Sequence, residues 1–265
     1  MAKIPASVQI LTFNNRDTIE RCLQSVQDFD DIIVLDGGST DGTLDVLARY
    51  GVRIYPQHED RAFSGPISDF SAVRNRGLDR ARYSWFIYID SDEFFPPETV
   101  EEIASIIRAS APSHYLWYIS RKPLIRGKVR DCGTAAPWLQ MRMFHRDYAE
   151  RFSGAVHEKV RPLPDFQIGI LKNPLIASQL GIAGYEQKLA QYLAIEEKRI
   201  RRIPRRKLVR KLFHPLRAIA AAIIKSYHTF FCLDSVPFDY EFARLKYHWM
   251  LFLIAVRRLI RVWEQ

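Results

Sequence analysis

Apolar and polar positions alternate between two periods along the first hundred residues. Runs that are apolar at nearly every position predict buried strands over residues 7–13, 31–36, 52–56 and 84–90. Apolar residues at helical spacing predict helices over residues 17–26, 41–51, 68–81 and 98–108. Strands that are apolar on both faces and alternate with amphipathic helices predict an α/β fold with a mostly parallel sheet, covered by helices on both sides.

The first of these helices carries a start signal of its own. Asp17 precedes the apolar positions and Glu20 follows three residues later, which predicts a capping box with Asp17 as the N-cap.

Polar clusters follow three of the predicted strands: TFNN (12–15), DGGSTDGT (36–43) and DSDE (90–93). In parallel sheets, ligands bind at the carboxyl ends of the strands. The three clusters therefore predict one binding site along a single edge of the sheet.

The third cluster places Asp90, Asp92 and Glu93 within four positions, directly after a buried strand. Carboxylates two residues apart can converge on one hard cation and leave coordination positions for phosphate oxygens. A more ordinary explanation is a loop of solvated acids before a helix, where negative charge is favourable.

The second cluster, LDGGSTDGT (35–43), places Asp36 at a strand end before two glycines and a polar helix start. This order suits a nucleoside held at the sheet edge. It matches neither the GxGxxG pattern nor a P-loop, so dinucleotide and P-loop functions are disfavoured. The alternative is a glycine-rich turn in which Ser39 or Asp41 caps the helix.

The remainder of the chain differs in pattern and charge. Residues 114–170 are rich in strand-like and turn-like pieces, and a long helical pattern begins near Tyr185. We therefore expect a catalytic domain over residues 1–180 and a helical, basic C-terminal region over residues 181–265. The formal net charge of +9 is uneven, since residues 196–265 hold 16 Lys or Arg against 6 Asp or Glu.

Three widely spaced cysteines and no CxxC pair argue against a zinc knuckle or a disulfide framework. The first residues predict no signal peptide, and no apolar run of about 18 residues predicts a spanning helix.

The segment KRIRRIPRRKLVRKLFHPLR (198–217) is densely basic. A nucleic-acid patch is disfavoured, because the segment holds no recognised binding motif and no aromatic residues interleaved through its centre. A contact with acceptor phosphates and a solvated face, which would be unusually one-signed, stay as alternatives. An anionic membrane surface is favoured, because aromatic residues suited to the interface follow or accompany it. These are Phe213, Tyr227, Phe230, Phe231, Trp249 and Trp263.

Four motifs occur in order: VQILTFNN, IVLDGGSTDGT, AVRNRGLDRA and IDSDE. In this order and spacing they resemble the nucleotide-sugar half of the glycosyltransferase family 2 enzymes, which have the GT-A fold. The segments LQMRMFHRDYAERFSGAVHEKV (139–160) and LKNPL (171–175) resemble the WaaE/KdtX-type lipopolysaccharide core glycosyltransferases.

The resemblance implies a role for each matching residue. Thr12, Phe13 and Asn14 would line the nucleotide pocket, and Asp36 would bond the uracil ring. Arg74 and Asn75 would approach the donor.

The same resemblance implies the metal and the base. Asp90 and Asp92 match the DxD motif, and with His157 they would hold Mg²⁺ or Mn²⁺. Imidazole is a competent ligand for such ions. Glu158 would take the proton from the attacking hydroxyl, although Glu93 is an alternative base.

These roles imply an inverting, metal-dependent transfer from a UDP-sugar to a lipid-linked or cell-envelope glycan: lipopolysaccharide core, capsule or exopolysaccharide. The enzyme would be cytoplasmic and peripheral on the inner face of the membrane, held there through residues 198–265, with no nucleic-acid partner. Two alternatives stay open: a nucleotidyltransferase, and a non-enzymatic scaffold that binds polyanions or lipids.

Overall fold

The computed structural model describes residues 2–58, 67, 69–130, 138–154, 158–179, 181–202, 215–217, 219–220 and 236–263. The chain divides into two compact units. Unit 1 comprises residues 1–122 and 138–178, and unit 2 comprises residues 123–137 and 179–265. The predicted roles of residues 1–180 and 181–265 stay predictions. His157 and most of the basic segment 198–217 lie outside the described residues.

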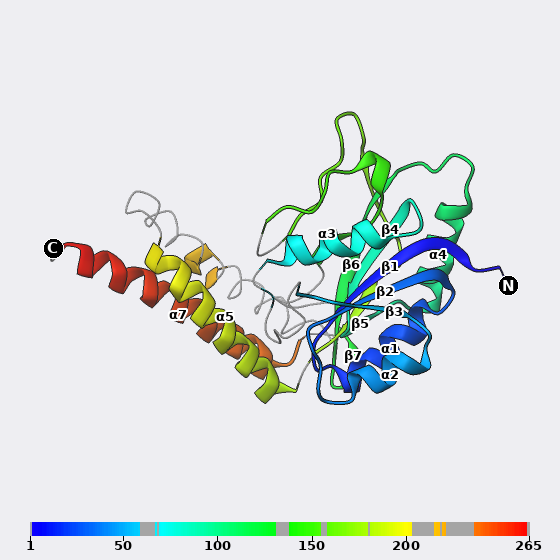
Figure 1. Cartoon of the computed structure of the whole chain (residues 1–265). Helices are drawn as coiled ribbons and strands as arrows, with labels where there is room; N and C mark the ends of the chain where they lie inside the picture. The colour runs from blue at the N-terminus through cyan, green and yellow to red at the C-terminus, as the bar shows by residue number, and fades with distance from the viewer. Residues whose placement is uncertain are drawn as a thin grey trace. The chain divides into compact units, whose positions relative to one another are not determined.

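Strands and helices alternate through the first hundred residues, as predicted (Figure 1). The strands are β1 (Ile4–Thr12), β2 (Phe29–Asp36), β3 (Arg53–Pro56), β4 (Trp85–Asp90), β5 (Glu93–Phe94), β6 (Leu116–Ile125), β7 (Lys128–Val129), β8 (Trp138–His145), β9 (Ile168–Ile170) and β10 (Leu175–Ser178). The helices are α1 (Arg16–Val26), α2 (Thr43–Arg49), α3 (Phe70–Arg80), α4 (Pro97–Arg108), α5 (Ile182–Arg202) and α7 (Phe238–Trp263).

The described strands form one mixed sheet in the order β3-β2-β1-β4-β8-β6-β10-β5. Strands β3, β2, β1 and β4 are parallel, and β8 then pairs antiparallel with β4 and with β6. The predicted α/β fold, with helices flanking the sheet and further helices at the C-terminal end, is confirmed. The parallel half of the sheet carries the three polar clusters.

The sequence of β4 explains why the sheet is covered on both faces. Side chains alternate across a strand, so Trp85 and Ile87 enter one core and Phe86 and Tyr88 enter the other. The first core also holds residues of α1, α2 and α4, and the second holds Leu78 of α3. Figure 1 shows α1 and α2 on one side of the sheet and α3 on the other.

The predicted N-cap of the first helix is wrong. The N-cap is Asn15, and Asp17 lies within the first turn. A carboxylate from the next loop supplies the contact instead, because Asp41 accepts a hydrogen bond from the backbone N–H of Arg16 at 3.0 Å. Tertiary contact therefore replaces the local capping box, and it ties the start of α1 to the DGGSTDGT loop.

Helix α3 approaches the sheet closely at Gly77. The side chain of Gln9 on β1 donates hydrogen bonds to the carbonyl oxygens of Val73 and Arg74, at 3.4 and 3.2 Å. A Cβ atom at Gly77 would lie 1.9 Å from Nε2 of Gln9. Glycine is thus required here for close packing of the helix that carries Arg74.

In unit 2, α5 and α7 pack against each other. Ile200 of α5 and Leu251 of α7 are buried together. A second small core joins Ile125, Val236 and Tyr240. No helix in the described part of the chain is long and apolar enough to cross a membrane.

We expect Gly77→Ala to lower the free energy of unfolding by up to about 2 kcal/mol. Alanine favours helix by about 1 kcal/mol, but overpacking against Gln9 costs about 1 to 3 kcal/mol. Chemical denaturation measures the change. In the double variant Gln9→Ala/Gly77→Ala the two effects should be non-additive, because the clash is gone. Strict additivity would contradict the packing argument.

Candidate active site

The carboxyl ends of the parallel strands bring the polar clusters to one edge of the sheet. Thr12 at the end of β1 is in register with Asp36 at the end of β2, and Leu11 is in register with Asp90 of β4. In the next strand, Pro56 of β3 is in register with Asp36. The clusters therefore share one edge, as the strand pattern predicted.

Asp36 holds the turn that follows β2. Its Oδ2 accepts hydrogen bonds from the backbone N–H groups of Gly38 and Ser39 at 2.8 and 2.9 Å, and its Oδ1 accepts one from the Ser39 hydroxyl at 2.5 Å. Asn14, in the left-handed region with a φ of 52°, accepts a hydrogen bond from the Thr40 N–H at 2.8 Å. The loops after β1 and β2 are thus fastened to each other.

A buried glutamine, which the sequence did not suggest, joins these two strand ends. The amide of Gln57 donates to the carbonyl oxygens of Thr12 and Leu35, at 3.0 and 2.9 Å. Its Oε1 and the hydroxyl of Thr12 are buried without a hydrogen-bond partner among the described residues. A Cβ atom at Gly37 would lie 2.8 Å from that Oε1 and 3.0 Å from Phe13. The edge therefore presents buried polar atoms that a ligand can satisfy.

The three acids after β4 lie close together. One carboxylate oxygen from each of Asp90, Asp92 and Glu93 falls within 4.8 Å of the other two. Oxygen donors at this spacing suit a hard cation such as Mg²⁺ or Mn²⁺. The residues present therefore fit the predicted metal.

Arginines within the protein relieve much of the repulsion between these acids. The fully buried Glu93 accepts hydrogen bonds from Arg121 Nε of β6 at 2.6 Å and from Arg142 Nη2 of β8 at 2.8 Å. It also accepts one from the backbone N–H of Asp90 at 3.0 Å. With both oxygens occupied and no exposed surface, Glu93 is poorly placed to act as the catalytic base.

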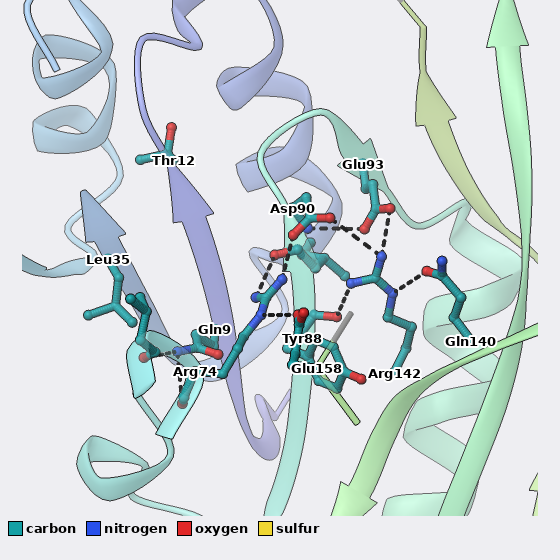
Figure 2. Close-up of polar contacts among 12 residues, drawn as sticks. Gln9, Thr12, Leu35, Arg74, Tyr88, Asp90, Glu93, Gln140, Arg142 and Glu158 are labelled. Carbon is teal, nitrogen blue, oxygen red and sulfur yellow. Dashed lines mark hydrogen bonds and ion pairs between the residues drawn. The ribbon is translucent and has the colours of Figure 1, made fainter. Parts of the chain in front are cut away.

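Two guanidinium groups flank Tyr88 and reach Asp90 (Figure 2). Arg74 Nη2 lies 2.5 Å from Oδ1 of Asp90, and Arg142 Nη2 lies 3.5 Å from Oδ2. The same guanidiniums lie 4.8 and 5.2 Å from the centre of the Tyr88 ring. The ring and the carboxylates together fix both buried arginines.

These contacts and the burial of the groups shift the pKa values of Asp90, Arg142 and Tyr88. Partial burial alone would raise the pKa of Asp90, whose side chain is 43% exposed, but Arg74, Arg142 and Arg121 hold this pKa well below its usual range. Burial would lower the pKa of Arg142, and Glu93 with Asp90 raises it instead. Burial raises the pKa of Tyr88 to about 12, so its hydroxyl stays protonated at neutral pH.

The predicted base lies beside the same network. Oε1 of Glu158 is 3.4 Å from Nε of Arg74. Asn75, the neighbour of Arg74, exchanges two hydrogen bonds of 3.0 Å with the backbone of Phe152. The amide of Asn75 therefore anchors the segment that leads to Glu158, and its predicted contact with the donor stays a prediction. His157 lies outside the described residues.

Sequence reasoning missed Arg121, Arg142 and Gln57. A signal existed for Arg142, which stands between Met141 and Met143 in a mostly apolar strand. Charged residues are seldom fully buried unless they are paired. Arg142 could thus have been predicted to meet an acid, although its partner could not.

Comparisons with known proteins find a family model that matches part of this chain. Residues 7–116 match the family model "Glycosyl transferase family 2". The matched residues, 110 of the 265 in the chain, are similar to glycosyltransferase family 2. The matched segment includes Asp36, Arg74 and Asp90, while Arg121, Arg142 and Glu158 lie beyond it.

Curated relatives of this chain include the SPbeta prophage-derived glycosyltransferase SunS of Bacillus subtilis. It is 29% identical over 151 residues, which cover 57% of this chain and 33% of SunS. The lipopolysaccharide core biosynthesis glycosyltransferase LpsC of Rhizobium meliloti is 25% identical over 161 residues, covering 60% of this chain and 58% of LpsC. The chain thus spans about a third of SunS and just over half of LpsC.

Among solved structures, S. aureus TarS 1–349 in complex with UDP-GlcNAc is similar with a TM-score of 0.48 and 18% identity. The match covers 66% of this chain and 58% of TarS.

We expect Glu93→Gln to lower the free energy of unfolding by about 3 to 5 kcal/mol, because Arg121 and Arg142 lose their shared buried carboxylate. Denaturant unfolding measures the loss. The matched control is Glu101→Gln at an exposed position of α4, with an expected change within about 0.5 kcal/mol. Equal losses for the two variants would rule out the buried network as a source of stability.

The lowered pKa of Asp90 predicts a pH dependence. Its charged form is stabilised in the folded state, so this stability is fully present above the unfolded pKa of about 3.9 and is lost as the pH falls through the folded value. In metal-free buffer, Asp90→Asn should be less stable than wild type at neutral pH. The difference should narrow below about pH 4. Denaturant unfolding of wild type and Asp90→Asn, measured from neutral pH to below pH 4, tests this prediction. A difference in unfolding free energy that does not change with pH would argue against the ion pairs.

Proposed function

We propose that the protein transfers a sugar from a UDP-sugar to an acceptor hydroxyl with inversion at the anomeric carbon. The observation that carries this proposal is the convergence of Asp90, Asp92 and Glu93 at the carboxyl edge of the sheet, beside the turn that Asp36 holds. The match of residues 7–116 to the family model "Glycosyl transferase family 2" supports the reaction class.

The nucleoside of the donor would lie at the ends of β1 and β2, against Thr12, Phe13, Asn14 and Asp36. The buried Thr12 hydroxyl and Gln57 Oε1 support this placement, because a bound nucleoside would supply polar atoms to groups that have no partner among the described residues. Among the residues that the structure describes, Oδ1 of Asp36 accepts a hydrogen bond only from the Ser39 hydroxyl, so it can also accept a base N–H.

The diphosphate would lie beside the acids that follow β4. Asp92 and Asp90 would hold Mg²⁺ or Mn²⁺, with His157 as a further ligand. When bound, such an ion would neutralise charge on the diphosphate leaving group. Arg74 orients Asp90 through the ion pair between them, and Asn75 fixes the neighbouring backbone.

The transfer step would use Glu158 as the base. The acceptor oxygen forms a bond to the anomeric carbon as the bond from that carbon to the UDP oxygen breaks. The acceptor proton passes to the carboxylate of Glu158, and UDP leaves with the bonding electrons. Attack opposite the leaving group inverts the configuration. Arg74, 3.4 Å from Glu158, holds this carboxylate in position.

The acceptor would be a lipid-linked or cell-envelope glycan, such as lipopolysaccharide core, capsule or exopolysaccharide. The match to LpsC, whose name assigns it to lipopolysaccharide core biosynthesis, supports this class. The basic residues from 196 onward support a peripheral place on the cytoplasmic face of an anionic membrane.

We expect Asp92→Ala to lower turnover by roughly a thousand-fold, because an ion in a site of this kind contributes several kcal/mol of charge stabilisation. Release of UDP from a panel of UDP-sugars, with Mn²⁺ and a membrane-fraction acceptor, measures the rate. Asp45→Ala, at an exposed position of α2, serves as the control and should keep full activity. EDTA should abolish activity, and added Mn²⁺ should restore it.

Three outcomes would count against the proposal. Full activity of Asp92→Ala or of the EDTA-treated enzyme would rule out the metal mechanism. Pyrophosphate in place of UDP would identify a nucleotidyltransferase. Tight binding of polyanions with no turnover of any UDP-sugar would identify a scaffold.

A further inference from the structure

Helix α7 is apolar on two opposite faces. One face is buried, and it includes Tyr240, Ala243, Leu251 and Ala255. Leu251 packs with Ile200 of α5. This face therefore accounts for the association of α5 with α7 within unit 2.

The opposite face is exposed. Phe238, Phe242, Trp249 and Ile260 keep 80%, 57%, 52% and 53% of their surface accessible. At 3.6 residues per turn these four positions fall within an arc of about 40°. We call Phe238, Phe242, Trp249 and Ile260 the α7 stripe.

Aromatic contacts preorganise the stripe. The rings of Phe238 and Phe242 stack at 6.1 Å, and those of Trp249 and Phe252 stack at 5.5 Å. A contiguous exposed apolar patch of this kind marks an interaction site more often than an isolated exposed residue does. The contact α7 makes with α5 leaves this face without a cover among the described residues.

Charge indicates which partner covers the stripe. Exposed Lys246 and Arg257 lie along one edge of it, and α7 as a whole carries five basic residues against two acidic ones. A second copy of the chain packed stripe to stripe would bring two basic helices together and repel. An anionic lipid surface instead offers phosphates to the basic residues and an interfacial layer suited to Trp and Phe.

We propose that the α7 stripe is the membrane-binding face of this protein. The helix would lie along an anionic bilayer, with Phe238, Phe242 and Trp249 at the headgroup level and with Lys246 and Arg257 on lipid phosphates. An in-plane orientation agrees with the finding that no described helix could cross a membrane. The inference rests on the peripheral location in the proposed function and names the surface responsible.

The test uses the full chain and vesicles of phosphatidylcholine with or without phosphatidylglycerol. The triple variant Phe238→Ser/Phe242→Ser/Trp249→Ser should bind the anionic vesicles at least about ten-fold more weakly than wild type in co-sedimentation, because three interfacial aromatic side chains are lost. The matched control is Tyr192→Ser, which removes an exposed aromatic residue of α5 that is not in the stripe. The control should bind as wild type does.

A second variant keeps the stripe and changes only charge. Lys246→Glu/Arg257→Glu should weaken binding to the anionic vesicles and leave the weak binding to neutral vesicles unchanged. Brominated lipid should quench wild-type tryptophan fluorescence, and Trp249→Phe should remove most of that quenching. Loss of quenching identifies insertion of this residue, which a general loss of stability would not produce.

Two results would overturn the inference. One is vesicle binding by the triple and charge variants equal to that of wild type. The other is a wild-type dimer that the triple variant converts to monomer without any change in vesicle binding, which would assign the stripe to self-association. A thermal shift with UDP and Mn²⁺, measured on each variant, reports the nucleotide site separately. Failure of the membrane proposal can thus be distinguished from failure of the proposed transferase.

Discussion

The buried carboxylate of Glu93 is the constraint on which the candidate site depends. A buried charge is tolerated only when it is paired and hydrogen-bonded. Its partners, Arg121 and Arg142, come from β6 and β8, which belong to the antiparallel half of the sheet. The acid loop of the parallel half can therefore reach its final geometry only when the antiparallel strands have joined. One salt-bridge network couples completion of the sheet to formation of the site.

The same network changes how the crowded acids of DSDE (90–93) are explained. From the sequence, a cation was the natural counter-charge for Asp90, Asp92 and Glu93. In the structure, arginines already neutralise Glu93 and hold Asp90 in its ionised form. A cation is therefore not needed to explain why the acids are tolerated. A bound cation would meet carboxylate oxygens that are already oriented. It would compete with the guanidinium groups for Asp90.

The division between what could and could not be predicted has a physical basis. Strands and helices of the first hundred residues follow from local periodicity, and the predicted ranges differ from the observed ones by a few residues at most. The parallel pairing of β1 with β2 then places Thr12 beside Asp36, because both residues end their strands. The errors concern contacts between distant segments. Asp41 displaces the predicted cap at Asp17, and Arg142 reaches an acid about fifty positions away, so no local pattern could identify either partner.

The two units differ in net charge as well as in packing. Unit 1 carries 19 basic and 22 acidic residues, and the arginines of the candidate site pair largely with its own acids. The proposed UDP-sugar would thus meet a unit with little net charge of its own, which favours local, directed contacts over long-range attraction. The excess positive charge lies instead in the segment that includes α7, where the exposed apolar residues also lie. Positive charge combined with exposed aromatic surface favours a lipid partner, because neither property alone would select a bilayer over a soluble polyanion or another protein.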